Sequence, residues 1–485
     1  MNDSLDQTGF GYRPGLDGLR ALAVLAVVGF HSGVFGAGWV GVDVFFALSG
    51  WLITGLVLDE ISRTGRLSLR AFWARRARRL LPGIGVVIVL VALLGITNVV
   101  EVRHRGLLGA TTYSTNWLNI TGGRSYWDAF ASPDPFEHLW SLAIEEQIYV
   151  IWPLVIAAVV MFGRSRRTIR FTAAAVAITS LIVAWVGASH GWSIDRLYQG
   201  TDTRASTFAL GAVFASMSFR RLPSWLNQVL LVVALAIGAW LARHGVGDTT
   251  MFHGRMALIS VCGLIAVMAA AAITTGPLCH PVLRRLGLWS YGIYLFHRPI
   301  ALAFDDESRW VRFILVLVFT IIVAAVSYTI VEQPIRHRLM KPTSWIAAIV
   351  VMVTALTTGV VVAQPVAPSE EALAPITLPS DDAGATSSTV KPRVLVIGDS
   401  VPALASRQIV EVGRRMGFEV GVVAEPACVP SPHAEDQYVP DVCVPFIDAL
   451  PTTIEDNRPD FVVWWWGGTG AGSDWNGNSV LYCAS

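Results

Sequence analysis

Apolar residues along this chain are grouped into blocks of about 20, the length that an α-helix needs to cross the hydrocarbon core of a bilayer. The blocks predict eleven membrane-spanning helices, at residues 16–36, 39–60, 80–100, 139–161, 171–189, 204–219, 226–243, 255–275, 287–304, 311–332 and 344–363. The moderately apolar stretch 106–120 would invert every later loop if it also crossed. We therefore interpret it as an interfacial or re-entrant piece of an all-α polytopic membrane bundle.

Basic residues are dense in every second loop. If the N-terminus is cytoplasmic, the inside loops carry the arginine runs at 63–79, 164–170, 220–221 and 284–285, and the basic residues at 336–341. The outside loops hold only Arg103, Arg105, Arg124, Arg196 and Arg309. This distribution satisfies the positive-inside rule in a single frame. An odd number of spans then places the C-terminal part outside.

The chain after the last span changes in character. We divide it into a transmembrane part at 1–343, a linking helix at 344–363, a flexible linker at 364–392 that is rich in Pro, Ser and Thr, and an extracytoplasmic part at 393–485. The β-branched run that begins at Arg393 predicts a small α/β region. Cys428 and Cys443 are close enough in sequence for a disulfide in an oxidising compartment, although unpaired thiols fit equally well.

Composition agrees with the membrane assignment. Hydrophobic residues make up 53% of the 485 residues and charged residues 15%, whereas a soluble chain has about 25% charged residues. Mean hydropathy is +0.55. The net charge of +1, with basic residues spread over short loops, gives no reason to expect a nucleic-acid partner. We also predict no metal site and no tightly bound cofactor.

Several ionisable residues fall within the predicted spans, where their cost makes them functional candidates. Arg20 and His31 are eleven residues apart, so they share one helix face and lie about 16 Å apart along its axis. Asp43 and Glu145 are expected at a depth similar to that of His31. A carboxylate there would orient the imidazole as a general base for a hydroxyl group. The alternative is a polar network that only holds helices together.

Arginines are concentrated before the third predicted span, where the sequence reads Arg75-Arg76-Ala-Arg78-Arg79. Planar guanidinium groups suit the phosphates of a nucleotide-tailed donor. A topology signal or contact with lipid headgroups explains the same run equally well.

These segments, in this order, resemble the membrane-bound acyltransferase family 3, the OafA-like O-acyltransferases of bacterial envelopes. The resemblance covers roughly residues 11–340. It rests on Leu16-Asp17-Gly-Leu-Arg20 with His31, Gly41 to Gly50, the arginines at 75–79, Tyr113-Ser-Thr-Asn116-Trp117, His138 to Tyr149, Asp202-Thr-Arg204 with Gly211, Trp289 to His297, and Tyr328 to Arg336. It implies a ten-helix acyltransferase core, here with an eleventh helix added. It also implies a bacterial cytoplasmic membrane protein with its N-terminus inside and its C-terminus outside.

The resemblance also assigns roles to residues. It makes Arg20 and His31 the essential pair, with His31 as catalytic base or transient acyl carrier. The donor acyl-CoA, usually acetyl-CoA, would contact Arg20, Arg75, Arg76 and Arg79, while Asp43 and Glu145 match acidic catalytic positions. Further site residues in the matching motifs are Glu146, Arg204, Ser290, Tyr291, His297 and Glu332.

The C-terminal part resembles the SGNH-hydrolase-like domain that some family members carry. Gly398-Asp399-Ser400 matches its first block, which makes Ser400 a catalytic candidate. The oxyanion-hole Asn block and the Asp-x-x-His block have no counterpart in the sequence. A serine without its base and oxyanion donors is a poor nucleophile. We therefore expect this domain to be incomplete or inactive.

Together these features predict an O-acyltransferase that moves an acyl group, usually acetyl, from cytoplasmic acyl-CoA to a hydroxyl of an extracytoplasmic envelope glycan or glycolipid. The alternative is a transporter or flippase without its own chemistry. A third reading is a scaffold whose tail recruits a partner.

Overall fold

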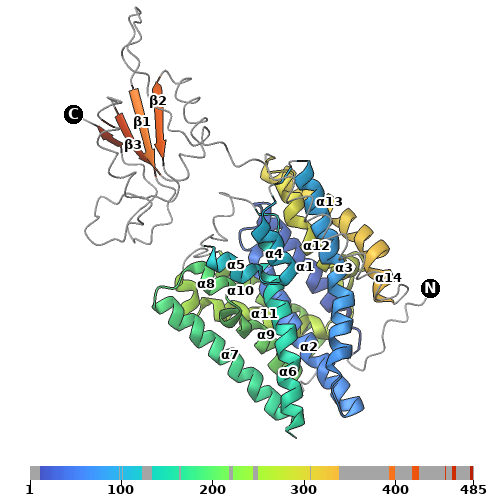
Figure 1. Cartoon of the computed structure of the whole chain (residues 1–485). Coiled ribbons are helices and arrows are strands. Elements are labelled where there is room, and N and C mark those ends of the chain that lie inside the picture. Colours follow the sequence, from blue (N-terminus) through green and yellow to red (C-terminus); the bar gives the residue numbers. More distant parts are fainter. Residues whose placement is uncertain are drawn as a thin grey trace, which may run out of the picture. The chain divides into compact units, whose positions relative to one another are not determined.

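The computed structural model describes residues 11–337, with short gaps at 98, 101, 123–133, 163–164, 218–221, 244–248 and 306, and then 393–398, 418–424, 454, 461–465 and 481–483. The chain divides into two compact units, Met1–Ala363 and Gln364–Ser485 (Figure 1). The described part of the first unit is helical. The finer domain limits predicted from the sequence fall among residues outside the described ranges and stay predictions.

The first unit is a bundle of long helices joined by short ones. The long helices are α1 (Pro14–His31), α2 (Gly41–Thr64), α3 (Leu69–Ile96), α6 (Trp140–Met161), α7 (Arg166–Ser189), α9 (Thr201–Ala215), α10 (Ser224–Ala242), α11 (Arg255–Ala272), α12 (Pro281–Leu302) and α13 (Arg309–Ser327). The short ones are η1 (Gly38–Val40), α4 (His104–Thr112), α5 (Thr115–Thr121), η2 (Glu137–Leu139), α8 (Ile194–Gln199), η3 (Thr249–His253), η4 (Pro277–Cys279), η5 (Tyr328–Glu332) and α14 (Gln333–Arg336).

Eight helical segments in the described part of the chain are long and apolar enough to cross a bilayer. They include η1–α2, η2–α6 and the run from α13 to α14 as single segments. The predicted spans at 204–219 and 287–304 correspond to α9 and α12, but α9 has only 15 residues and α12 carries three arginines. The eleventh predicted span, 344–363, lies outside the described residues. The chain is thus a multi-pass helical membrane protein.

The start of the third long helix differs from the sequence prediction, whereas the stretch 106–120 does not span, as predicted. The third long helix begins at Leu69, well before residue 80, where the side chain of Ser68 accepts a hydrogen bond from the amide of Ala71. The arginines at 75–79 therefore belong to α3 and not to a loop. The stretch 106–120 forms parts of α4 and α5, which are too short to cross a bilayer.

Small residues allow the central helices to approach closely. A side chain on Gly50 of α2 would overlap the backbone carbonyl of Phe208 in α9, and one on Gly211 of α9 would overlap the carbonyl of Ala47 in α2. Reciprocal small residues of this kind are typical of tightly packed membrane helices. Helix α1 packs against α2, α11 and α12, which brings its charged face into the interior of the bundle.

The second unit contains a four-stranded sheet with the order β2-β1-β3-β4, formed by β1 (Arg393–Gly398), β2 (Glu419–Ala424), β3 (Phe461–Trp465) and β4 (Leu481–Cys483). The central strand β1 is parallel to both neighbours, and β4 is antiparallel to β3. This arrangement agrees with the predicted α/β character. Ser400, Cys428 and Cys443 lie outside the described residues, so the SGNH assignment and the disulfide stay predictions.

Candidate active site

Three histidines from different helices meet in the bundle. His31 ends α1, His138 lies in η2 and His297 lies in α12. The Nε2 atom of His297 is 3.0 Å from Nδ1 of His31. The ring of His297 is also 4.9 Å from the ring of His138. His138 and His297 are buried, with exposed fractions of 1% and 0%. We call these three residues the histidine cluster.

Backbone carbonyls fix the proton positions in the histidine cluster. The Nδ1 atom of His297 is 2.6 Å from the carbonyl oxygen of Tyr294, which only accepts, so Nδ1 carries the hydrogen and Nε2 is an acceptor. The Nδ1 atom of His31 must then donate, both to His297 and to the carbonyl of Val27 at 3.1 Å. The basic lone pair of His31 consequently lies on Nε2, as a general base requires.

His138 belongs to a motif of the family, but the sequence alone does not mark it as a site residue. Its Nε2 atom lies 3.1 Å from the carbonyl of Leu295 and donates to it, so Nδ1 carries the lone pair. Within the described part of the chain this buried Nδ1 has no hydrogen-bond partner. Its position directly before the apolar start of α6 is the one sequence feature that could have marked it as a site residue. Its partners lie on α12, too distant in sequence for the pattern to reveal them.

A cavity of about 750 Å³, including its open mouth, lies between α1, α2, α3, α6 and α12. Three arginines, Arg20, Arg76 and Arg79, line it together with Glu145. The other lining residues are Val42, Phe45, Phe46, Leu48, Ser49, Leu52, Leu80, Ser141, Leu142, Tyr149, Ser290, Tyr291 and Tyr294. Cationic groups and apolar walls thus share one cavity, and this combination suits a ligand with an anionic head and a long organic arm.

The structure separates Arg75 from the other two predicted donor-binding arginines of α3. Its guanidinium forms an ion pair of 2.6 Å with Glu60, and its side chain is 49% exposed. Arg75 is not among the cavity-lining residues, whereas Arg76 is and also lies over the ring of Tyr149 at 5.8 Å. Residues 75–79 already belong to α3, and successive residues of a helix point about 100° apart. Arg75 and Arg76 therefore face different sides of the helix.

Glu145 is held by hydroxyl groups inside the cavity. Ser49 donates to its Oε1 atom at 2.9 Å, and Tyr149 donates to Ser49 at 2.7 Å. Arg20 lies 3.8 Å from Asp17 on the same helix face. Glu145 thus belongs to the cationic cavity. The structure does not bring it to His31.

Asp43 is not brought to His31 either. Its Oδ1 atom accepts hydrogen bonds from Arg204 at 3.0 Å and from Thr207 at 3.4 Å. The side chains of Asp43 and Arg204 are 0% and 1% exposed, which makes this a fully buried ion pair between α2 and α9. The prediction that Asp43 orients the imidazole is therefore wrong, because Asp43 is bonded to α9, whereas His297 and the carbonyl of Val27 accept from His31.

Two of the remaining predicted site residues line the cavity, whereas Glu146 and Glu332 are not among its lining residues. Ser290 and Tyr291 line it, and the Tyr291 hydroxyl donates to the carbonyl of Leu80 at 2.7 Å. Glu332 ends the π-helical turn η5 and accepts from Ser327 at 3.1 Å. Such turns occur often at functional sites. Within the described residues, one oxygen of Glu146 is buried without a hydrogen-bond partner.

Tyr294 connects the cavity to the histidine cluster. It lines the cavity, its hydroxyl donates to the carbonyl of His138 at 2.7 Å, and that hydroxyl is 2.5 Å from the hydroxyl of Ser141. Its own carbonyl accepts from His297. No histidine of the described chain lines the cavity, and Tyr294 is a lining residue that is also bonded to the histidine cluster.

A tyrosine just before the first span contributes to the opposite, Arg20-bearing end of α1. The Tyr12 hydroxyl donates to Asp17 at 2.8 Å and accepts from Arg284 at 2.9 Å. Burial and the neighbouring Asp17 raise the pKa of Tyr12 above its ordinary value. The hydroxyl therefore stays protonated and joins the start of α1 to α12.

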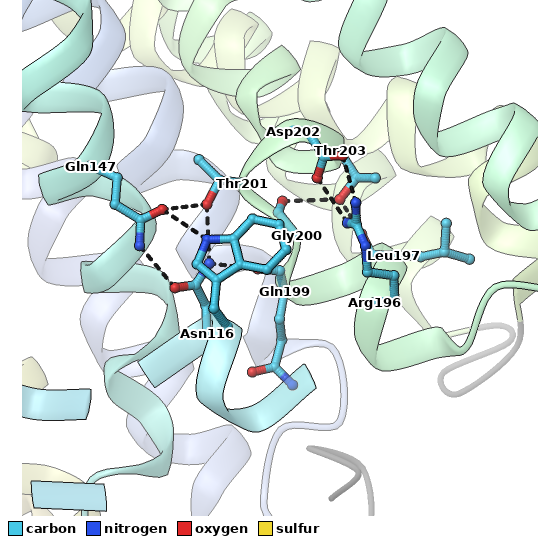
Figure 2. A network of polar contacts seen from close by, with 10 residues as sticks. Asn116, Gln147, Arg196, Leu197, Gln199, Gly200, Thr201, Asp202 and Thr203 are labelled. Atoms are coloured by element: carbon cyan, nitrogen blue, oxygen red, sulfur yellow. Dashed lines mark hydrogen bonds and ion pairs between the residues drawn. The ribbon is translucent and has the colours of Figure 1, made fainter. Parts of the chain in front are cut away.

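A polar network joins α5, α6, α8 and α9 (Figure 2). Gln147 donates to Asn116 at 3.0 Å and accepts from Thr201 at 2.5 Å. Asn116 in turn donates to Thr201 and to the carbonyl of Gln199. In the described part of the chain, no group of three or more His, Cys, Asp or Glu side chains is placed to hold a metal ion.

Comparison with known proteins gives a consistent assignment. The model of the acyltransferase domain family Acyl_transf_3 matches residues 13–331. The chain is 34% identical over 359 residues to the putative peptidoglycan O-acetyltransferase YrhL of Bacillus subtilis, covering 67% of this chain and 55% of that protein. It is 32% identical over 348 residues to the peptidoglycan O-acetyltransferase OatA of Listeria monocytogenes, covering 67% and 56%.

The putative O-acetyltransferase SAS0844 of Staphylococcus aureus is 34% identical over 358 residues, with 69% of this chain and 59% of that protein covered. The matched part is thus little more than half the length of these relatives. No solved structure gave a significant match. The family model covers the cavity and the histidine cluster, and the chain belongs to the OafA-like acyltransferase family 3.

Proposed function

We propose that this protein transfers an acyl group, usually acetyl, from cytoplasmic acyl-CoA to a hydroxyl group of an extracytoplasmic envelope glycan or glycolipid. The observation that carries the proposal is the paired His31 and His297 beside a cavity lined by three arginines. The names of the similar proteins support it, since two of them are called peptidoglycan O-acetyltransferases.

The donor would enter the cavity with its phosphates among the guanidinium groups. Arg20, Arg76 and Arg79 supply planar, permanently charged donors that match phosphate oxygens. The apolar lining residues would pack against the pantetheine arm. Along α1, the eleven residues from Arg20 to His31 span about 16 Å, and an extended pantetheine arm is long enough to cover that distance.

His31 would act as the base. Its Nε2 atom takes the proton of the acceptor hydroxyl, and that oxygen attacks the thioester carbonyl. The tetrahedral intermediate then collapses to the ester and expels the CoA thiolate, which recovers the proton from His31. His297 accepts the hydrogen on Nδ1 of His31 throughout, so it holds the ring in place and stabilises the imidazolium.

Tyr294 would control passage between the two regions. The thioester must pass its side chain to reach His31, because Tyr294 lines the cavity and also contacts the histidine cluster. The proposed orientation has the N-terminus in the cytoplasm of a bacterium and the C-terminus outside. It follows from the arginine-rich loops and places the donor-binding arginines on the side where acyl-CoA is made.

The test is acyl-CoA consumption by the full chain in lipid nanodiscs. Wild-type protein should release free CoA thiol from acetyl-CoA, whereas His31→Ala should reduce the rate by about 10²–10⁴. Thiol release also separates an enzyme from a transporter, which would leave the thioester intact. Wild-type protein that neither binds nor consumes acetyl-CoA would refute the proposal.

Two adjacent arginines provide a matched pair of variants for the donor site. Arg76→Ala should weaken acetyl-CoA binding about tenfold or more, because a charge-assisted phosphate contact contributes about 1.5–3 kcal/mol. Arg75→Ala removes the same charge from a side chain that is paired with Glu60 outside the cavity, and it should have a much smaller effect. Equal losses in the two variants would place the phosphates elsewhere.

A further inference from the structure

An aromatic and charged surface cluster lies outside the cavity. The Arg196 guanidinium binds both carboxylate oxygens of Asp202, at 2.8 Å and 2.6 Å. It also lies 4.5 Å from the ring centroid of Trp192 and 5.2 Å from that of Trp117. We call Trp117, Trp192, Arg196 and Asp202 the Arg196 platform. Trp117 is 36% exposed and the Asp202 side chain 42%.

The polar network beneath holds this platform rigid. The indole Nε1 of Trp117 donates to Gln147 at 3.3 Å, and Gln147 also accepts from Thr201. Thr201 immediately precedes Asp202, as Figure 2 shows. Gln147 therefore holds Trp117, and Arg196 holds the side chain of Asp202, so little side-chain freedom remains to be lost when a ligand binds.

The platform differs from an ordinary aromatic belt at a membrane surface. A belt tryptophan keeps its indole N–H at the wet side, and a belt arginine extends its charge toward water. Here the Trp117 N–H is turned to Gln147, and Arg196 is held by Asp202. The arrangement leaves indole surface and a carboxylate exposed together, with the carboxylate still able to accept further hydrogen bonds.

This combination fits a sugar ring. A pyranose has a flat face of C–H groups that packs on an aromatic ring, and hydroxyl or amide hydrogens around its edge that bond to a planar carboxylate. Two other ligands fit less well. An acyl chain has no donor for the carboxylate of Asp202. A lipid phosphate would be repelled by that carboxylate, and two donors of Arg196 are already bonded to it.

The platform also lies at the end of the bundle where the histidine cluster sits. Helix α6 starts beside His138, and α7 runs back, so α8 with Arg196 begins at that same end. Helix α5, which carries Trp117, packs against η2, which carries His138. Tyr198 of α8 completes the connection, because its ring lies 4.8 Å from that of Trp140.

We propose that the Arg196 platform is an acceptor subsite that binds an uncharged N-acetylhexosamine ring of a glycan strand, next to the ring whose hydroxyl reaches His31. The inference rests on the proposed glycan acylation and adds the place where the acceptor is held. Trp117 packs against the sugar face, and Asp202 accepts from its hydroxyl or amide hydrogens.

The test measures binding of a β-1,4-linked N-acetylglucosamine hexamer to the full chain in nanodiscs, by saturation-transfer NMR and titration without donor. Trp117→Leu and Arg196→Lys should each weaken hexamer binding about tenfold, because one removes the aromatic face and the other the planar fork that positions Asp202. Trp240→Leu is the matched control, since Trp240 is 61% exposed on α10. It should bind the hexamer as the wild type does.

A second substitution at Trp117 distinguishes a loss of sugar binding from a loss of folding. Trp117→Phe retains a smaller aromatic face and should bind with intermediate affinity, which a general loss of folding would not produce. Wild-type protein that does not bind the hexamer would overturn the proposal, as would Trp117→Leu with unchanged affinity. A Trp117→Leu variant that alters stability only in anionic nanodiscs would identify a lipid contact instead. A wild-type protein that binds the hexamer but does not consume acetyl-CoA would contradict the proposed function and leave the sugar subsite in place.

Discussion

His297 provides the sharpest test of the proposed chemistry, because the structure gives it one specific task. Its Nε2 atom accepts the hydrogen on Nδ1 of His31 at 3.0 Å, and its ring is fully buried. His297→Ala would remove this acceptor and leave the contact between Nδ1 of His31 and the carbonyl of Val27, at 3.1 Å. The variant therefore measures what orienting His31 contributes to the rate, while the catalytic base itself stays in place.

The magnitude follows from the hydrogen bond that is lost. Losing one such bond to the base costs about 1–1.5 kcal/mol, which corresponds to roughly a five- to tenfold lower kcat. His31→Ala removes the base and should cost about 10²–10⁴. His297→Gln retains a side-chain oxygen as an acceptor and should recover part of the loss. The KM for acetyl-CoA should change little in the two His297 variants, because His297 does not line the cavity.

The assay is single-turnover release of CoA thiol, with thermal unfolding measured on the same samples to confirm folding. If His297→Ala is as inactive as His31→Ala, then His297 itself transfers protons and the assigned tautomers are wrong. If His297→Ala has wild-type kcat, the contact between the two rings plays no part in catalysis. Only an intermediate kcat, partly restored by His297→Gln, agrees with a positioning residue.

Two further predictions concern stability and are both checked by thermal unfolding in nanodiscs. Arg204→Met should destabilise the protein by about 3–5 kcal/mol because Asp43 stays buried without its ion-pair partner, whereas Arg75→Met, at a surface pair, should cost about 1 kcal/mol or less. Gly50→Ala should lower the melting temperature or prevent folding because the methyl group overlaps the backbone of α9, while Gly36→Ala, in open space, should be tolerated. Similar losses within either pair would contradict the packing described here.

The hydrophobic pattern of this sequence was sufficient to locate the ten long helices that the structure describes. A helix in lipid must be about 20 apolar residues long and satisfies its backbone hydrogen bonds internally, so its presence is a local property. Its ends are less local. The start of α3 at Leu69 depends on the Ser68 cap and on packing of a basic turn, neither of which gives an apolar signal.

The candidate residues were also predictable, since charge in a membrane is conspicuous in a sequence. Their partners were not. Depth along a helix suggested that Asp43 could reach His31, but depth gives no information about which way each helix is rotated about its axis. The close approach of α2 and α9 at Gly50 and Gly211 turns Asp43 toward Arg204 and away from His31.

The sequence by itself thus determined the membrane class, the helices and the chemistry available to the site. The tertiary structure decided which groups work together. His31 and His297 are separated by 266 positions, and His138 meets His297 through a third helix. Contacts of this kind depend on how helices from distant parts of the chain pack, because side-chain orientation across an interface is not encoded in the periodicity of either helix alone.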